Sequence, residues 1–106
     1  MVKELVNVQD FQEIIANNIT IIDFYADWCV PCKLFSPVLD RFEKKYQMIK
    51  FCKINSDNPD LSEIINACSI NSLPTFCFFY NGAYITKVIG SDESLFEKTI
   101  QEMLKN

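Results

Sequence analysis

The sequence contains no histidine, and Cys29 and Cys32 form its single Cys-X-X-Cys pair. A structural zinc site takes four ligands, which are usually cysteine or histidine. The pair would need two further ligands, and the sequence offers neither a histidine nor a second pair at this spacing. We therefore expect no metal site and no bound cofactor, with zinc as the weaker alternative for this pair.

Long hydrophobic runs are also absent. No apolar run approaches the roughly 18 residues that a membrane helix needs, and Met1 leads into Lys3 and Glu4 rather than into an apolar leader. The single arginine and the nine lysines are scattered along the chain, and the formal net charge is −4. These features predict a cytoplasmic protein whose partners are neither a membrane nor a nucleic acid.

Glycine and proline are scarce, with two and four residues, and no linker or repeat is visible. The 106 residues, 49% of them hydrophobic, fit one domain over residues 1–106, and we expect a monomer. Five cysteines is an odd number, whereas a secreted disulfide scaffold usually has an even set at compact spacing. A reducing compartment fits better, and there a dithiol pair is catalytic rather than structural.

The segment around Cys29 and Cys32 combines two hydrophobic periodicities, that of a strand and that of a helix. β-Branched and aromatic residues run from Ile19 to Ala26 over the length of a buried strand. Apolar residues then recur every three or four positions, as in a helix that packs against a sheet, at Cys32, Phe35, Leu39, Phe42 and Tyr46. Cys29 therefore lies where a helix begins.

The two thiols of the pair are expected to differ. A thiolate at a helix N-terminus is stabilised by free backbone N–H groups and by the helix dipole, so Cys29 should be the exposed nucleophile. Cys32 lies one turn further on and shares a helix face with Cys29, so it can reach any sulfur bonded to Cys29. This spacing suits two-electron disulfide reduction, with Cys32 as the resolving thiol.

The remaining elements follow from caps, periodicity and turn signals. We expect a short edge strand at Val6 and its neighbours before it, a helix from Asn7 to Asn18, a strand from Ile49 to Ile54, a helix from Asn58, and a hairpin around Asn81-Gly82. A last helix should follow, capped by Ser91. The prediction is an α/β fold with a central mixed sheet of about five strands, flanked by four helices.

These residues resemble the thioredoxin family over essentially the whole chain. The resemblance rests on motifs in the order and spacing of that family: Asp23, Trp28-Cys29, Pro31-Cys32-Lys33, Pro37, Lys53, Leu73-Pro74-Thr75, Asn81-Gly82 and Gly90. One residue departs from the pattern, because Val30 stands where most members have glycine. The motif thus reads Cys-Val-Pro-Cys, and a bulkier, stiffer residue flanks the nucleophile.

The resemblance implies roles for residues around the pair. Asp23 would be a buried carboxylate with a raised pKa that accepts a proton from Cys32 through water, and Lys53 would modulate it. The alternatives without a functional role are that Asp23 is a strand-end aspartate that faces water and that Lys53 is a strand lysine that extends to solvent. The Leu73-Pro74 bond is expected to be cis and to face the dithiol, with a trans turn as the alternative.

A flat apolar rim around Cys29 is the implied docking surface for partner proteins, formed by Trp28, Val30, Pro31, Leu73, Pro74 and Gly90. Trp28 could instead belong to the core. The other cysteines, Cys52, Cys68 and Cys77, are expected to pack as small hydrophobes. A regulatory role of Cys68 is the alternative that the resemblance leaves open.

The function implied is a protein-disulfide reductase that works as an electron carrier. It would be recycled by a thioredoxin reductase and would reduce targets such as peroxiredoxins or ribonucleotide reductase. An oxidase or isomerase of the protein disulfide isomerase type is an alternative, but Val30 supplies no positive charge to stabilise the thiolate. A glutaredoxin and a scaffold module without turnover are two further alternatives. The presence of both Cys29 and Cys32 together with Asp23 disfavours the scaffold.

Overall fold

The computed structural model describes residues 1–105. Its elements follow the chain in the order β1 (Lys3–Glu4), α1 (Val8–Ile15), β2 (Ile19–Tyr25), α2 (Val30–Lys45), β3 (Ile49–Asn55), η1 (Pro59–Leu61), α3 (Ser62–Ala67), β4 (Thr75–Tyr80), β5 (Ala83–Ile89) and α4 (Glu93–Leu104). Both the order and the types of the main elements agree with those expected from the sequence.

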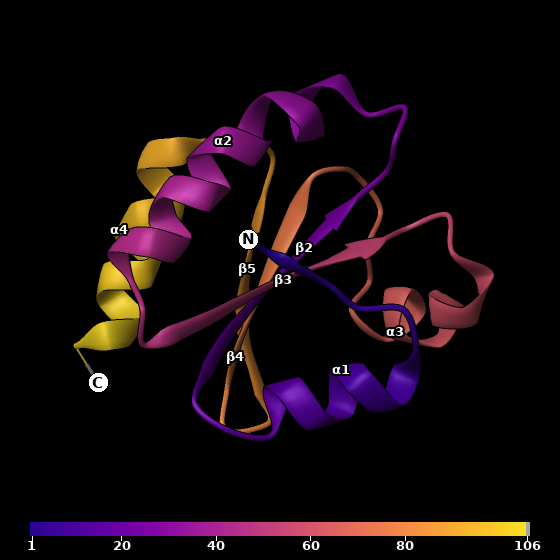
Figure 1. Ribbon diagram of the computed structural model, residues 1–106, viewed down its shortest axis with the longest axis horizontal. Coiled ribbons are helices and arrows are strands. Elements are labelled where there is room, and N and C mark those ends of the chain that lie inside the picture. Colours follow the sequence, from indigo (N-terminus) through magenta and orange to yellow (C-terminus); the bar gives the residue numbers. More distant parts are fainter. Residues whose placement is uncertain (106) are drawn as a thin grey trace.

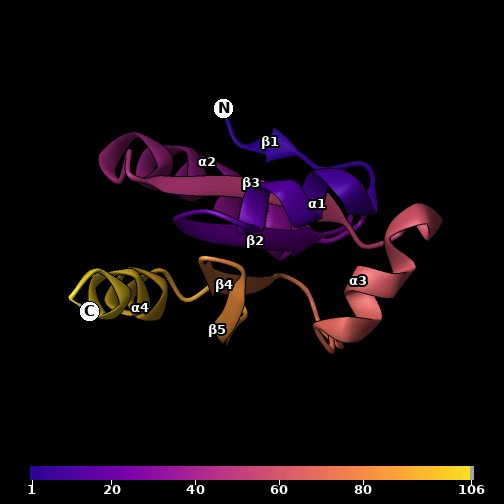
Figure 2. The same cartoon turned by 90° about the horizontal axis from the view of Figure 1, so that it is seen from below.

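The five strands form one mixed sheet in the order β1-β3-β2-β4-β5. The first three are parallel, whereas β4 runs antiparallel to β2 and β5 antiparallel to β4. Helices α2 and α4 cover one face of the sheet, and α1 and α3 cover the other (Figures 1 and 2). The predicted fold class is therefore confirmed.

Each face of the sheet has its own buried cluster. On the α2 and α4 side, the ring of Phe96 is fully buried and packs against Phe35, Phe42, Phe76 and Phe78, with centroids 4.8 to 5.7 Å apart. On the other side, aliphatic and aromatic residues of α1, α3 and the strands enclose three free cysteines: Cys52, Cys68 and Cys77. All three are buried, as expected for cysteine in a core.

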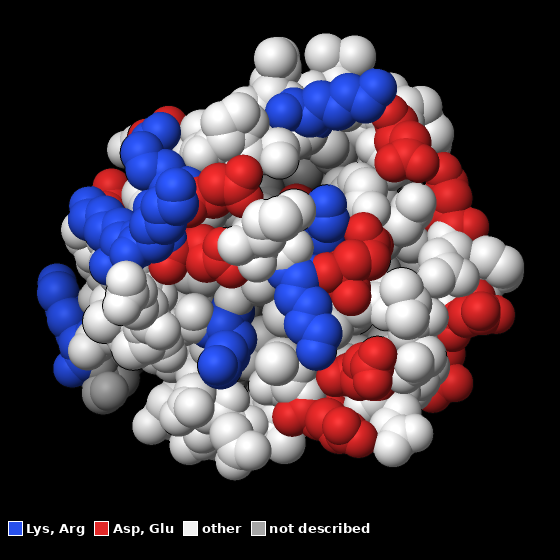
Figure 3. All heavy atoms as spheres, in the orientation of Figure 1, with Lys and Arg blue, Asp and Glu red and all other residues white. Residues whose placement is uncertain are grey.

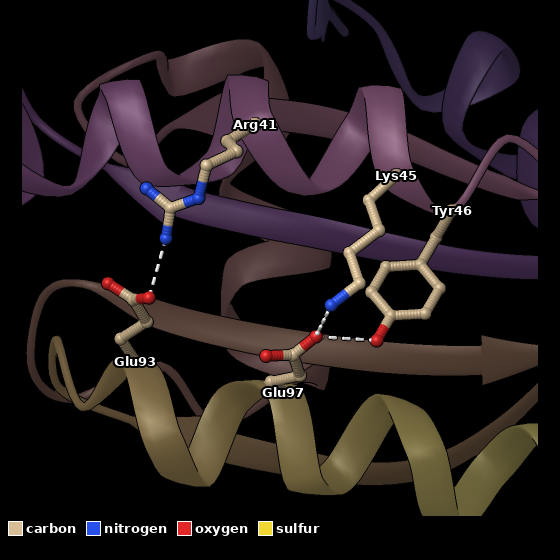
Figure 4. A network of polar contacts seen from close by, with 5 residues as sticks. All are labelled: Arg41, Lys45, Tyr46, Glu93 and Glu97. Atoms are coloured by element: carbon tan, nitrogen blue, oxygen red, sulfur yellow. Dashed lines mark hydrogen bonds and ion pairs between the residues drawn. The ribbon is translucent and has the colours of Figure 1, made fainter.

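Helices α2 and α4 are also linked along their exposed edge (Figure 4). Arg41 donates to Glu93 at 2.5 Å, and Lys45 donates to Glu97 at 2.5 Å. The Tyr46 hydroxyl donates to the same Glu97 carboxylate at 2.6 Å. In the view of Figure 3, basic and acidic side chains are mixed over α2 and α4, further basic ones lie in the middle of the face, and those over the α1 and α3 side are acidic.

Capping and turn residues in the sequence predicted most ends of the helices and strands correctly. Asn7 caps α1 by accepting a hydrogen bond from the Asp10 backbone N–H at 2.8 Å. Asn81 and Gly82 both have positive φ, 48° and 87°, as the two-residue turn requires. The expected cap of the last helix was wrong, because Asp92 rather than Ser91 accepts from the Leu95 N–H.

The predicted short edge strand is present among the residues before Val6, at Lys3–Glu4, and Val6 itself lies outside it. The helix expected from Asn58 is divided into the 3-10 turn η1 and the short helix α3. Within residues 1–105, no helix has the length and apolar character needed to cross a membrane.

Candidate active site

The dithiol pair lies at the junction of β2 and α2. After β2 ends at Tyr25, the Cys29 backbone N–H donates to the Ala26 carbonyl at 3.1 Å, and Cys29 becomes the N-cap of α2. Cys29 and Cys32 are joined by a disulfide, with Cα atoms 5.3 Å apart. The predicted position of Cys29 at the helix start is confirmed.

The burial of the pair corrects one expectation. Cys29 was expected to be the exposed thiol, but Cys29 is 4% exposed and Cys32 is 7% exposed. Both belong to a buried cluster with Ala26, and the partly buried side chains of Tyr25 and Leu73 pack against this cluster. Exposure therefore does not distinguish the two sulfurs in this oxidised state.

Backbone hydrogen bonding does distinguish them. The Cys32 backbone N–H donates to the Cys29 Sγ at 3.2 Å. This N–H is one of the free donors of the first helical turn, and such a donor favours the charged form of a sulfur. The arrangement can stabilise a thiolate at Cys29.

Asp23 lies in the middle of β2 and is buried, with 8% of its surface exposed. Its Oδ1 atom has no hydrogen-bond partner among residues 1–105. Burial raises the pKa of the Asp23 carboxyl from 3.8 to about 7, against a lowering by Lys53 and with a further rise caused by Glu4. The expected burial and raised pKa are confirmed, and the reading of a water-facing aspartate is wrong.

A cavity of about 150 Å³ is lined by both Asp23 and Cys32. Lys53 and Ser36 of α2 also line it. A water molecule occupies about 30 Å³ in the liquid, so the cavity has room for water between the carboxylate and the sulfur. The geometry allows a proton to pass from Cys32 to Asp23.

Lys53 is placed beside Asp23 by the sheet, because the two residues are register partners on β3 and β2. Its ammonium nitrogen also lies 4.0 Å from Glu4 Oε1 on β1 and 5.3 Å from the centre of the Tyr25 ring. The Tyr25 hydroxyl donates to the same Glu4 oxygen at 2.6 Å. Lys53 is therefore shared between two carboxylates rather than paired with Asp23 alone.

The apolar rim is partly exposed as expected. Trp28 is 68% exposed and Val30 is 61% exposed, so the reading of Trp28 as a core residue is wrong. Pro31 is exposed as well, Leu73 and Gly90 are half-buried, and Pro74 is buried.

The Leu73-Pro74 bond is cis, which confirms that expectation. The Gly90 N–H donates to the Pro74 carbonyl at 2.8 Å, and Gly90 has a φ of 92°. That φ explains the glycine, because other residues rarely adopt it.

The sequence model of the thioredoxin family matches residues 2–103. The chain belongs to the thioredoxin family. It is 41% identical over 104 residues to a thioredoxin-like protein of Acanthamoeba polyphaga mimivirus, with 95% of this chain and 76% of that protein covered. Thioredoxin of Oryctolagus cuniculus is 31% identical over 107 residues, with 98% and 100% covered.

Solved thioredoxin structures agree with this assignment. Oxidised mitochondrial thioredoxin 3 of Saccharomyces cerevisiae superposes with a TM-score of 0.89 at 33% identity, covering 95% of this chain and 94% of that one. Thioredoxin of Trypanosoma brucei brucei gives a TM-score of 0.92 at 28% identity, with 100% and 93% covered. The chain is accordingly a thiol-disulfide oxidoreductase of the thioredoxin type.

Three residues that contact this thioredoxin site were not predicted from the sequence. Glu4 and Tyr25 surround Lys53, and Asp57 accepts a hydrogen bond from Trp28 Nε1 at 2.9 Å. Lys53 lies in an apolar strand, and a lysine at such a position indicates a carboxylate partner on a neighbouring strand. For Asp57, which lies 29 residues from Trp28, no local pattern gives a signal.

Proposed function

We propose that this thioredoxin reduces protein disulfides with Cys29 as the nucleophile, Cys32 as the resolving thiol and Asp23 as the proton acceptor. The observation that carries the proposal is the placement of the pair at the start of α2. There a backbone N–H reaches the Cys29 sulfur, and a cavity joins Cys32 to a buried carboxylate.

In the first step, the Cys29 thiolate attacks one sulfur of the target disulfide. A bond forms between Cys29 and that sulfur, and the other target sulfur leaves as a thiolate. The Cys32 N–H and the positive end of α2 favour the Cys29 thiolate from which this step starts.

In the second step, Cys32 loses its proton and attacks the Cys29 sulfur. The Cys29–Cys32 disulfide forms, and the second target sulfur leaves. Asp23 takes the proton through water in the cavity, because a carboxyl with a pKa of about 7 can both accept and release a proton near neutral pH. Lys53 modulates this step, since its charge lowers the pKa of Asp23.

We further propose that targets dock on the rim around the dithiol. Trp28, Val30 and Pro31 are exposed and lie next to Cys29 in the chain, and Leu73, which precedes the buried Pro74, packs against the cluster that contains Cys29. Exposed apolar surface next to a reactive thiol suits protein partners. The bond from Trp28 Nε1 to Asp57 supports a fixed orientation of the indole ring.

The proposed electron donor is a thioredoxin reductase, and the proposed targets include peroxiredoxins and ribonucleotide reductase. A related solved structure, at 32% identity and a TM-score of 0.89, concerns the thiol resolving mechanism of yeast mitochondrial 1-Cys peroxiredoxin by the glutathione and thioredoxin systems. Cys52, Cys68 and Cys77 are unpaired, which suits a reducing compartment. We therefore propose a monomeric electron carrier of the cytoplasm.

The test is turnover of NADPH with insulin as the disulfide substrate. We expect turnover with thioredoxin reductase and little turnover with glutathione and glutathione reductase. Cys52→Ser is the matched control, because it removes a buried thiol outside the site, and it should keep the activity that Cys29→Ser loses. Turnover with the glutathione system alone would contradict the proposal.

A further inference from the structure

An apolar groove of about 240 Å³ opens on the sheet face that α1 and α3 cover, and we call it the α1–α3 groove. Val8 and Phe11 of α1 line it, as do Ile64 and Ala67 of α3. The two residues of each pair are three positions apart, so each helix turns one face toward the groove. A water molecule occupies about 30 Å³ in the liquid, so the groove has room for a much larger group.

The sheet adds two aromatic rings to the groove. Phe79 of β4 and Tyr84 of β5 line it, with ring centroids 5.6 Å apart and the rings edge to face at 89°. Tyr84 is 44% exposed, so apolar surface of the groove is open to solvent. A large apolar side chain that enters here would lose contact with water on several sides, which favours binding.

The strand residues of the groove lie at the end of the sheet away from the dithiol. Phe79 pairs with Tyr84 on one side and with Thr20, near the start of β2, on the other. Cys29 comes after the opposite end of β2. The proposed disulfide-reducing cycle uses no residue of the groove, so binding there and disulfide exchange use different surfaces.

The surroundings of the groove carry negative charge that the chain itself does not neutralise. Residues 5–32 and 54–86, which include α1 and α3, contain no lysine or arginine. The ion pairs within residues 1–105 involve none of the carboxylates of α1, η1 and α3, which are Asp10, Glu13, Asp60 and Glu63. Glu63 lines the groove itself, and Figure 3 shows that the charged side chains on this side are acidic.

This combination indicates what kind of molecule fits. The apolar lining calls for a large apolar group, and the surrounding carboxylates call for positive charge beside it. A nucleic acid or an acidic protein would be repelled. A second copy of this chain is disfavoured as well, because its formal net charge is −4. A peptide segment with lysine or arginine on both sides of a large apolar residue complements both features.

We propose that the α1–α3 groove is a docking site for a protein partner that presents a phenylalanine or leucine flanked by lysine or arginine. The apolar side chain enters the groove between α1 and α3, and its removal from water supplies affinity. The basic side chains face Glu63 and the neighbouring carboxylates, which orients the partner and speeds association. The dithiol stays accessible, so this binding function is independent of disulfide reduction.

The test uses the oxidised chain and a cysteine-free peptide, acetyl-Gly-Lys-Lys-Phe-Lys-Lys-Gly, with a fluorescent label at its C-terminus. Fluorescence anisotropy measures its binding. A matched peptide with serine in place of phenylalanine keeps the charge and should bind about 10-fold more weakly. A second matched peptide with serine in place of every lysine keeps the ring and should bind about 5-fold more weakly.

Variants of the chain test the place of binding. Ala67→Phe fills the groove from an exposed position on α3 and should weaken binding by about 10-fold or more. Glu63→Lys should weaken it about 5-fold, because it reverses a charge at the groove. Asp40→Lys makes the same change of net charge at an exposed position of α2, and should change binding by less than about 2-fold.

NMR of the unmodified chain gives a readout that does not depend on how the variants fold. On titration with the peptide, the amide signals of Ala67 and Tyr84 should shift, and that of Trp28 should not. The absence of saturable binding, equal binding of either matched peptide, shifts at Trp28 instead of the groove, or a dimer of the chain that occupies the groove would each overturn the proposal. None of these readouts uses disulfide reduction, so failure here is distinct from failure of the proposed function.

Discussion

Asp23 destabilises the fold whenever it carries its charge. Its pKa is raised from 3.8 to about 7 in the folded chain, chiefly by burial. The folded state therefore holds the proton more tightly than the unfolded chain, and this favourable contribution is lost as the pH rises from 3.8 through about 7. Since one pKa unit corresponds to about 1.4 kcal/mol, the ionised carboxylate costs about 4 kcal/mol above that range.

Asp23→Ala should therefore stabilise the protein at high pH and slow disulfide reduction. Denaturant midpoints of parent and variant should be similar near pH ~4 and diverge by pH ~8, with the variant more stable. Loss of the proposed proton acceptor should lower the reduction rate on the order of 10²-fold. Asp40→Ala, which removes an exposed carboxylate of α2, serves as the control and should change neither quantity. A parent that is more stable than Asp23→Ala at high pH would rule out Asp23 as the proton acceptor.

At the scale of elements, the charge at Asp23 depends on three adjacent strands. Glu4, Lys53 and Asp23 are register partners across β1, β3 and β2, and Tyr25 holds Glu4 by a hydrogen bond. Glu4 raises the pKa of Asp23 directly, and it also competes for the Lys53 ammonium that lowers it. The edge strand β1 is therefore a part of the active site that is expected to tune its pH dependence.

Glu4→Gln should lower the pKa of Asp23, and Lys53→Met should raise it. Both changes should be smaller than the effect of burial, which is the largest cause of the shift. Carboxyl titration by carbon-13 NMR measures the pKa, and the pH profile of disulfide reduction should move in the same direction. Glu13→Gln, an exposed change on α1, is the control. Shifts of the same sign in the two active-site variants would contradict this arrangement.

Short-range signals in the sequence predicted the elements that position the dithiol. The cap at Asn7, the turn at Asn81-Gly82 and the switch of period at Cys29 each involve neighbours in the chain, and the structure bears them out. Asp92 took the capping role expected of Ser91 because aspartate and serine are nearly equivalent caps. A capping pattern in the sequence does not locate the start of a helix to within one residue.

Contacts between distant residues could not be predicted in this way. Glu4 bonds to Tyr25 across 21 residues, and Asp57 bonds to Trp28 across 29. Leu73, which is distant from Cys29 in the sequence, likewise packs against the buried cluster that contains Cys29. Such contacts arise from strand register and loop packing, which composition and periodicity do not encode.

For the molecule as a whole, stability should depend on the aromatic cluster rather than on the ion pairs between α2 and α4. Phe96 is fully buried among four other rings, so Phe96→Ala should cost about 3 to 5 kcal/mol. Arg41 pairs with Glu93 at the exposed surface shown in Figure 4, and Arg41→Ala should cost less than about 1 kcal/mol. Urea unfolding at neutral pH measures both variants. A larger loss of unfolding free energy for Arg41→Ala than for Phe96→Ala would show that the ion pairs between α2 and α4 contribute more to stability than the aromatic cluster.

The central claim is that Cys29 attacks and Cys32 resolves, and trapping of the mixed disulfide tests it most directly. Reduced Cys32→Ser and Cys29→Ser are each mixed with insulin, quenched with acid and analysed by mass spectrometry. Cys32→Ser should accumulate a stable adduct through Cys29, because no neighbouring thiol can release the target, and Cys29→Ser should accumulate little. Equal adducts in both variants, or an adduct through Cys32 alone, would contradict the assignment of the two thiols.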